Sequence, residues 1–173
     1  MTLTLILVVA LVVLAGALAF AAFRLRRPRV TERGAGRVLI PFTGGALDAR
    51  VLSAGIRIAR AEHATLVPAY LIVVPLEQPQ DAPMQQQVTR AMPLLEAVEH
   101  AALRAGVPVD ARIEKGRTLT HALKRLWEVE RFDRIIAPAP TNGHGGFTEK
   151  ELAWVLMHAP SETVVLKPMP DAA

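Results

Sequence analysis

The chain has 173 residues and no cysteine, which excludes disulfide bonds and lipoprotein attachment and fits a reducing compartment. Its formal net charge of +4 comes from one segment: Arg24 to Arg37 holds six arginines and one acid, whereas 14 basic and 15 acidic residues follow from Val38 onward. The nearly neutral remainder has few aromatic residues, so it lacks the basic face and stacking side chains expected of a protein that binds nucleic acid.

The first expected element is an uncharged run of 21 residues from Leu3 to Phe23. A helix of this length spans roughly 31 Å, close to the thickness of a bilayer core, so the run predicts one transmembrane helix over 1–23. A cleaved signal peptide and a buried core helix are the alternatives. A signal peptide, however, has basic residues before a shorter apolar stretch, and here the basic residues follow a long one.

Residues 24–36 predict a basic juxtamembrane linker that contacts anionic lipid headgroups through Arg24, Arg26, Arg27 and Arg29. Cytoplasmic flanks of membrane spans carry the excess of Lys and Arg. We therefore expect a single-pass protein of the inner or plasma membrane, with its N-terminus outside. The rest of the chain is long enough for one cytoplasmic domain and too short for two.

Strand-like and helix-like patterns alternate through this domain. The strand patterns are short apolar runs, and the helix patterns repeat apolar residues every three or four positions. The expected strands are Val38–Phe42, Leu66–Val74, Val107–Ile113, Arg134–Ala137 and Thr163–Leu166. The expected helices run through Leu47–Ile58, Leu94–Ala102, Leu119–Val129 and Thr148–Leu156.

Local signals mark the ends of two helices. Pro93 either starts or kinks the second helix, and Gly106 is placed to end it. Thr148 and Glu151 have the spacing of a capping box, which predicts the start of the last helix.

This alternation predicts a single doubly wound α/β domain, with a five-stranded parallel, Rossmann-like sheet covered on both faces. We assign it to residues 37–168, followed by a tail at 169–173. In such sheets ligands bind beyond the carboxyl ends of the strands, where the winding reverses. The candidate binding segments are therefore Thr43–Gly45, after the first strand, and 140–146, after the fourth.

Seven short segments occur in a characteristic order along this domain. They are Val38–Gly45, Gly106–Val109, Glu114–Gly116, Phe132–Ile136, Gly143–Phe147, His158–Pro160 and Val164–Leu166. Through their order and spacing, residues 37–168 resemble a universal stress protein domain. The resemblance implies a role in stress response and a homodimer formed through the last strand. It also implies a membrane transporter as a partner, because such domains often accompany transporters.

The resemblance further implies where ATP or AMP would bind. Members that bind ATP use an Asp at the end of the first strand and a loop of Gly, two residues, Gly, nine residues, Gly, and Ser or Thr. The backbone N–H groups and the hydroxyl of this loop hold phosphate. The corresponding candidates here are Thr43, Gly44, Gly45, Leu71, Gly143, His144, Gly145, Gly146 and Thr148.

The sequence departs from the ATP-binding pattern at three points. Thr43 replaces the Asp, which removes a carboxylate acceptor for adenine or ribose. The first loop glycine falls at Pro138 or Pro140, and proline has no N–H to donate. Nine residues after Gly143 come Ala153–Trp154 instead of Gly and Ser. The phosphate half of the site is therefore expected to be degenerate.

Structural roles compete with ligand roles for several candidates. Gly44 and Gly45 suit a tight turn, and a surface loop accounts for 143–146 equally well. Thr148 already has a structural role as a helix cap.

The sequence contains no recognisable catalytic constellation. Neither of its serines, Ser53 and Ser161, lies in a Gly-x-Ser-x-Gly elbow, its histidines lack metal-ligand spacing, and it has no P-loop. We therefore expect a membrane-tethered, non-catalytic regulatory domain without a metal site. Two alternatives remain. One is an ATP- or AMP-binding stress protein with a rearranged glycine loop, which includes the case of a slow ATPase, and the other is a purely structural adaptor.

Overall fold

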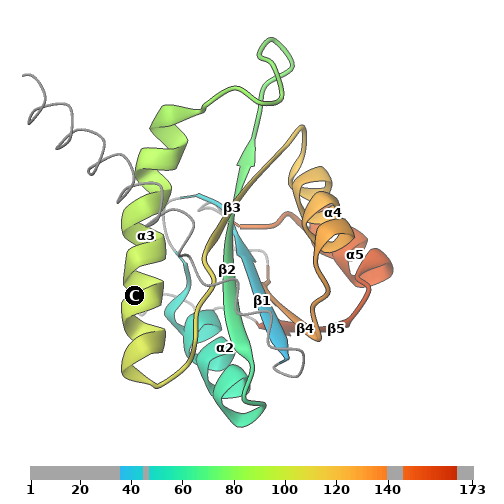
Figure 1. The fold of residues 1–173 in the computed structure, drawn as a ribbon. Coiled ribbons are helices and arrows are strands. Elements are labelled where there is room, and N and C mark those ends of the chain that lie inside the picture. Colours follow the sequence, from blue (N-terminus) through green and yellow to red (C-terminus); the bar gives the residue numbers. More distant parts are fainter. Residues whose placement is uncertain (1–35, 45–46, 140–145, 167–173) are drawn as a thin grey trace, which may run out of the picture. The chain divides into compact units, whose positions relative to one another are not determined.

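The computed structural model describes residues 36–44, 47–139 and 146–166 (Figure 1). The chain divides into two units, Met1–Gly34 and Ala35–Ala173, and the described residues belong to the second. The predicted transmembrane segment, nearly all of the predicted linker and the tail lie outside the described residues. Within the described part, no helix combines the length and apolar character needed to cross a membrane.

Five strands alternate with four helices along the described residues. The strands are β1 (Arg37–Phe42), β2 (Thr65–Val73), β3 (Arg112–Gly116), β4 (Arg134–Pro138) and β5 (Glu162–Leu166). The helices are α2 (Ala49–Ala61), α3 (Gln85–Arg104), α4 (Leu119–Val129) and α5 (Glu149–His158).

The strands form one parallel sheet in the order β3-β2-β1-β4-β5. From β1 the chain winds outward through β2 to β3, and it then returns to the other side of β1 to form β4 and β5. Helices α2 and α3 cover one face of the sheet, and α4 and α5 cover the other (Figure 1). The predicted doubly wound parallel sheet is thus confirmed, and its winding reverses between β1 and β4.

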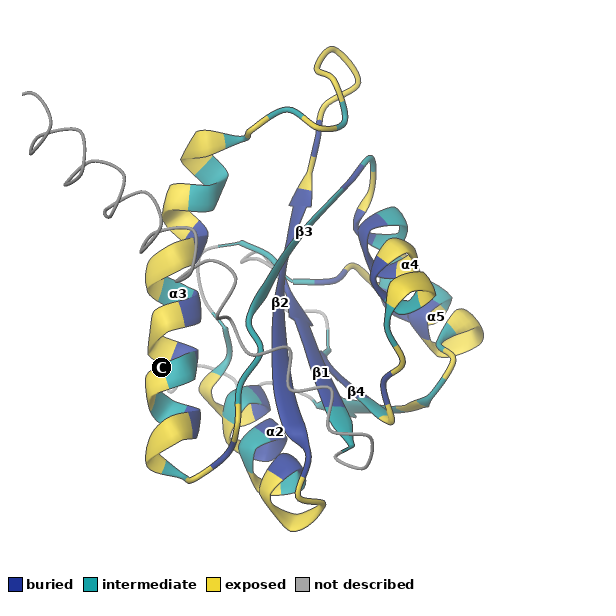
Figure 2. Cartoon of the chain, in the orientation of Figure 1, coloured by how far each residue is buried: buried dark blue, intermediate teal, exposed yellow. Residues whose placement is uncertain are grey.

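The core lies on both faces of the central strands, which are almost wholly buried (Figure 2). Alternation along β1 sends Leu39 into the cluster beneath α4 and α5, and it sends Val38 and Ile40 into the cluster beneath α2. Helix α2 approaches β1 closely, because a Cβ atom added at Gly55 would lie 2.3 Å from Cδ1 of Ile40. Burial on both faces explains why these strands have nearly continuous apolar sequences.

Two element boundaries differ from the sequence prediction by five residues or more, and the others differ by three or fewer. The third strand begins at Arg112 instead of Val107, and before it only Val109 forms an isolated bridge, to Leu66. Helix α3 begins at Gln85, so Pro93 lies within the helix and does not start it. Gly106, with φ of 73°, follows the end of α3 as predicted.

Candidate functional site

The carboxyl ends of β1 and β4 lie side by side at the point where the winding reverses, as the sequence predicted. Thr43 and Gly44 directly follow β1, and Gly146 and Thr148 precede α5. The described residues thus place these four candidates on the two segments that border this point. The other loop candidates, Gly45, Gly143, His144 and Gly145, lie outside the described residues.

The turn after β1 is held by a side chain from the neighbouring strand. Gly44 has φ of 85°, a conformation that glycine adopts without steric cost. The Tyr70 hydroxyl donates a 3.1 Å hydrogen bond to the Gly44 carbonyl oxygen, and the Tyr70 ring packs edge-on against Phe42, with 5.4 Å between centroids. Gly44 therefore has a structural role in the turn. Tyr70 was not among the residues predicted from the sequence, because no local pattern pairs it with Gly44.

Asp48, beside this turn, caps the first helix. Its Oδ1 accepts hydrogen bonds from the backbone N–H groups of Arg50, at 2.7 Å, and Val51, at 3.4 Å. Two N–H groups that a helix N-terminus can offer to an anion are therefore already satisfied by a carboxylate. The signal for this cap in the sequence is an Asp close to the start of a helical pattern, and Asp48 was not among the predicted residues.

Thr148 and Glu151 form the predicted capping box at the start of α5. The Thr148 Oγ1 accepts a 3.3 Å hydrogen bond from the Glu151 N–H. In return, Oε2 of Glu151 accepts 2.8 Å bonds from both the N–H and the hydroxyl of Thr148. The Thr148 hydroxyl thus donates within its own helix, and the first turn of α5 carries the negative charges of Glu149 and Glu151.

The remaining described candidates have different environments. Leu71 is 1 % exposed and lies within the core cluster under α4 and α5. At Gly146 an added Cβ atom would meet nothing within 4 Å, so the described surroundings do not require glycine there. Pro138 is the last residue of β4, and the next residue, Ala139, donates its N–H to the Leu166 carbonyl oxygen at 2.8 Å.

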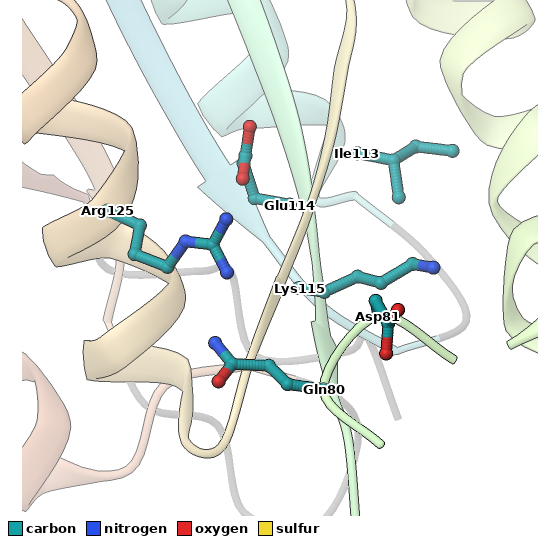
Figure 3. Close-up of a pocket in the computed structure, with 6 residues that line it drawn as sticks. All are labelled: Gln80, Asp81, Ile113, Glu114, Lys115 and Arg125. Carbon is teal, nitrogen blue, oxygen red and sulfur yellow. The ribbon is translucent and has the colours of Figure 1, made fainter. Parts of the chain in front are cut away.

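A hollow that was not predicted from the sequence lies beside the edge strand β3 (Figure 3). It has a volume of about 560 Å³ and is lined by Gln80, Asp81, Ile113, Glu114, Lys115 and Arg125. Figure 3 shows Glu114 and Arg125 on one side of β3 and Ile113 and Lys115 on the other. Burial raises the pKa of the Glu114 carboxyl above its ordinary 4.5, although nearby Arg125 and Arg112 oppose the shift.

Two basic side chains fix the loop that borders this hollow. Lys115 Nζ donates a 2.5 Å hydrogen bond to the Ala82 carbonyl oxygen. The Arg117 guanidinium donates to the carbonyl oxygens of Pro75 and Gln78, the latter at 2.9 Å. Both side chains therefore donate to loop carbonyl oxygens, so they have fewer hydrogen-bond donors left for an anionic ligand.

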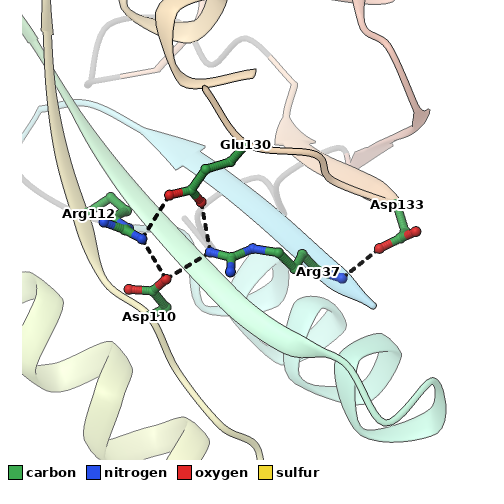
Figure 4. Close-up of polar contacts among 5 residues, drawn as sticks. All are labelled: Arg37, Asp110, Arg112, Glu130 and Asp133. Carbon is green, nitrogen blue, oxygen red and sulfur yellow. Dashed lines mark hydrogen bonds and ion pairs between the residues drawn. The ribbon is translucent and has the colours of Figure 1, made fainter. Parts of the chain in front are cut away.

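The opposite, amino-terminal edge of the sheet carries a ring of ion pairs (Figure 4). The guanidinium Nη2 atoms of Arg37 and Arg112 each lie 2.8 Å from a carboxylate oxygen of Asp110 and from one of Glu130. Two cations and two anions therefore neutralise one another. The backbone N–H of Arg37 also donates to Asp133 at 2.7 Å. We call Arg37, Asp110, Arg112 and Glu130 the ion ring. It joins the start of β1 to the segments that flank β3 and β4.

The fold is similar to that of solved universal stress proteins, although no family model and no curated protein matches the sequence. The universal stress protein UspA from Lactobacillus plantarum has a TM-score of 0.60 and 15% identity, over 76% of this chain and 97% of its own. A family protein from Arabidopsis thaliana with AMP bound has a TM-score of 0.58 and 17% identity, over 79% and 94%. A universal stress protein in complex with cAMP has a TM-score of 0.55 and 17% identity, over 79% and 99%.

At 15% to 17% identity this likeness concerns the fold. The described domain therefore has the universal stress protein fold, as the order of its sequence segments predicted.

Proposed function

We propose that this chain is a membrane-tethered, non-catalytic regulatory domain of the universal stress protein type, with a degenerate nucleotide site. The observation that carries the proposal is the capping box of α5. A phosphate at the N-terminus of α5 would meet the Glu151 carboxylate, which already accepts from the Thr148 N–H and hydroxyl. Like charges repel there, so this end of the helix is a poor site for a triphosphate.

The turn after β1 supports the same proposal. Thr43 supplies no carboxylate, and the nearest acid along the chain, Asp48, is engaged as the cap of α2. The adenosine half of the site thus lacks the acidic acceptor that ATP-binding members use.

A nucleoside monophosphate is the second candidate ligand. Two proteins with this fold were solved with AMP and with cAMP, which carry one phosphate each. A site that has lost its triphosphate contacts can still bind adenosine with a single phosphate. In this alternative, a rearranged glycine loop would contact the ligand through Gly44, Gly143, Gly145, Gly146 and Thr148.

Tethering follows from the sequence before the described domain. The uncharged run Leu3–Phe23 would span the membrane, and the arginines after it would hold the domain on the cytoplasmic side. We further propose a homodimer formed through β5, an edge strand, and a membrane transporter as a partner.

Thermal unfolding of the full chain tests the nucleotide proposal. A ligand at about 100 times its Kd stabilises a protein by about 2.7 kcal/mol, which raises the Tm of a domain of this size by at least about 5 °C. At a concentration about 100 times a micromolar Kd, we expect ATP and ADP to shift the Tm by less than about 1 °C. A shift with AMP alone would favour the monophosphate alternative, and an equal shift with ATP would contradict a degenerate site.

Protease accessibility tests the orientation. In intact cells, an added protease should spare the domain, and it should digest the domain only after the membrane is permeabilised. Digestion of the domain in intact cells would show that it lies outside the membrane, which contradicts the proposed orientation.

A further inference from the structure

We propose that the exposed side of α2 docks onto anionic phospholipid headgroups. The surface consists of Arg50, Ser53, Arg57 and Arg60, which we call the α2 stripe. These residues are exposed, and they lie three or four positions apart, on one side of the helix. The proposal rests on the proposed membrane anchor, which would bring this surface to the bilayer.

The charge of α2 distinguishes it from the other helices of the described domain. Within Ala49–Ala61 there are three arginines and no acid. In contrast, α3, α4 and α5 each combine basic and acidic residues. A helix face of one sign attracts a surface of the opposite sign, and each Lys or Arg adds to the attraction for an anionic membrane.

The two acids that flank α2 are engaged by groups other than the Arg57 and Arg60 side chains. Asp48 caps the helix, and Glu62 forms a 2.6 Å ion pair with Arg134. Among the described residues, Arg57 and Arg60 form no ion pair with a carboxylate. Their guanidinium groups can therefore bind the phosphate of a lipid without first breaking an internal pair.

The shape of the surface suits a headgroup. An open hollow of about 520 Å³ lies between α2 and the end of β5. It is lined by three small or apolar residues, Ala49, Ala54 and Leu166, and by three polar residues, Arg50, Ser53 and Arg57. Small side chains leave room for a phosphodiester, and the Arg57 guanidinium supplies hydrogen-bond donors to it.

The sequence before the domain keeps the α2 stripe close to the membrane. Twelve residues separate Phe23, at the end of the apolar run, from Gly36. Even when fully extended, such a linker reaches only about 40 Å, which makes docking an intramolecular event at high effective concentration. This reach favours the anionic leaflet over a soluble anionic partner as the occupant.

Site-specific fluorescence quenching tests the proposal on the full chain reconstituted in vesicles. Because the chain has no cysteine, Ser53→Cys gives a single labelling site on the α2 stripe. Ala153→Cys, at an exposed position on α5 in the other helical layer, is the matched control. We expect a headgroup-attached quencher to quench the label at 53 in vesicles containing phosphatidylglycerol. Quenching should be weak in pure phosphatidylcholine and at 153.

Substitution of the arginines then separates the α2 stripe from the basic linker. The pair Arg57→Gln and Arg60→Gln should lower the ratio of docked to undocked domain about 30-fold, at about a factor of five for each charge. Arg57→Lys with Arg60→Lys should retain most of the docking, and Arg24→Gln with Arg26→Gln should leave the 53-to-153 contrast in place. Equal quenching at 53 and 153, or quenching that the Gln pair does not change, would overturn the proposal.

Flotation of vesicles tests the proposed membrane anchor separately from docking through the α2 stripe. An anchored chain floats with neutral phosphatidylcholine vesicles even at high salt. If it does not, the anchor is wrong, and docking is judged by salt-sensitive binding to phosphatidylglycerol vesicles. Loss of that binding in the Arg57→Gln, Arg60→Gln chain would support the α2 stripe, and unchanged binding would refute it.

Discussion

Gly116, at the carboxyl end of β3, has no room for a side chain, because backbone atoms lie too close to it. A Cβ atom there would lie 2.4 Å from the Ala122 backbone nitrogen and 2.9 Å from the Thr118 carbonyl oxygen. These atoms belong to the first turn of α4 and cannot move as a flexible side chain can. The closeness of β3 to α4 therefore depends on glycine at this position.

Gly116→Ala should lower the free energy of unfolding by about 2–3 kcal/mol, because the helix must shift to admit a methyl group. Gly146→Ala is the control, since its Cβ would meet open space, and it should change stability by less than about 0.5 kcal/mol. Urea denaturation measures both variants. Equal losses of unfolding free energy in the two variants would show that the neighbouring backbone at Gly116 tolerates a methyl group.

Glu114 gives the domain a dependence on pH. Burial raises the pKa of this carboxyl above 4.5, so the folded state holds the proton more tightly than the unfolded chain does. Stability attributable to this group is therefore highest when it is protonated, and it falls as the pH rises above 4.5 through the raised pKa.

Glu114→Gln should consequently stabilise the protein near neutral pH relative to the parent, and the gain should vanish below pH 4.5. Urea denaturation at the two pH values measures the difference. Glu128→Gln, at an exposed position on α4, controls for the loss of one charge. A gain that is the same at both pH values would mean that ionisation of Glu114 is not its source.

At the scale of secondary-structure elements, the ion ring connects parts of the chain that are distant in sequence. Its side chains are 21% to 35% exposed, so solvent screens them less than the surface pair of Lys124 and Glu128, which is 58% to 61% exposed. Removing one anion leaves two partly buried arginines with a single carboxylate between them.

Glu130→Gln should therefore destabilise the domain by about 1–2 kcal/mol, a value reduced from that of a fully buried pair because of the exposure. Glu128→Gln should cost less than about 0.5 kcal/mol. The difference should shrink at high salt, because salt screens the charges. Similar losses in the two variants, measured by urea denaturation, would argue against a special role for the ion ring.

The elements that sequence could predict are those with a strong local pattern. Buried strands such as β1 and β2 have nearly continuous apolar runs, and the spacing of Thr148 and Glu151 predicted the cap of α5. The strand β3 was placed too early because it lies at the edge of the sheet, where Arg112, Glu114 and Lys115 mask the apolar pattern. The contact of Tyr70 with Gly44 joins positions 26 residues apart, so no local spacing encodes it.

At the scale of the whole molecule, the domain combines a complete doubly wound fold with a ligand edge that we propose to be degenerate. The doubly wound sheet places the turn after β1 and the start of α5 at the position where this architecture binds ligands. Both flanking helices begin there with an acidic side chain engaged in capping, Asp48 on α2 and Glu151 on α5. These two carboxylates thus occupy backbone N–H groups at the helix N-termini that could otherwise bind phosphate.

Calorimetric titration of ATP into the full chain is the sharpest test of the proposal that the nucleotide site is degenerate. The predicted result is no saturable heat at micromolar ATP, for both the parent chain and a Gly143→Val variant. A micromolar Kd for ATP, equivalent to about −8 kcal/mol, that the Gly143→Val substitution abolishes would contradict the claim and identify a working glycine loop.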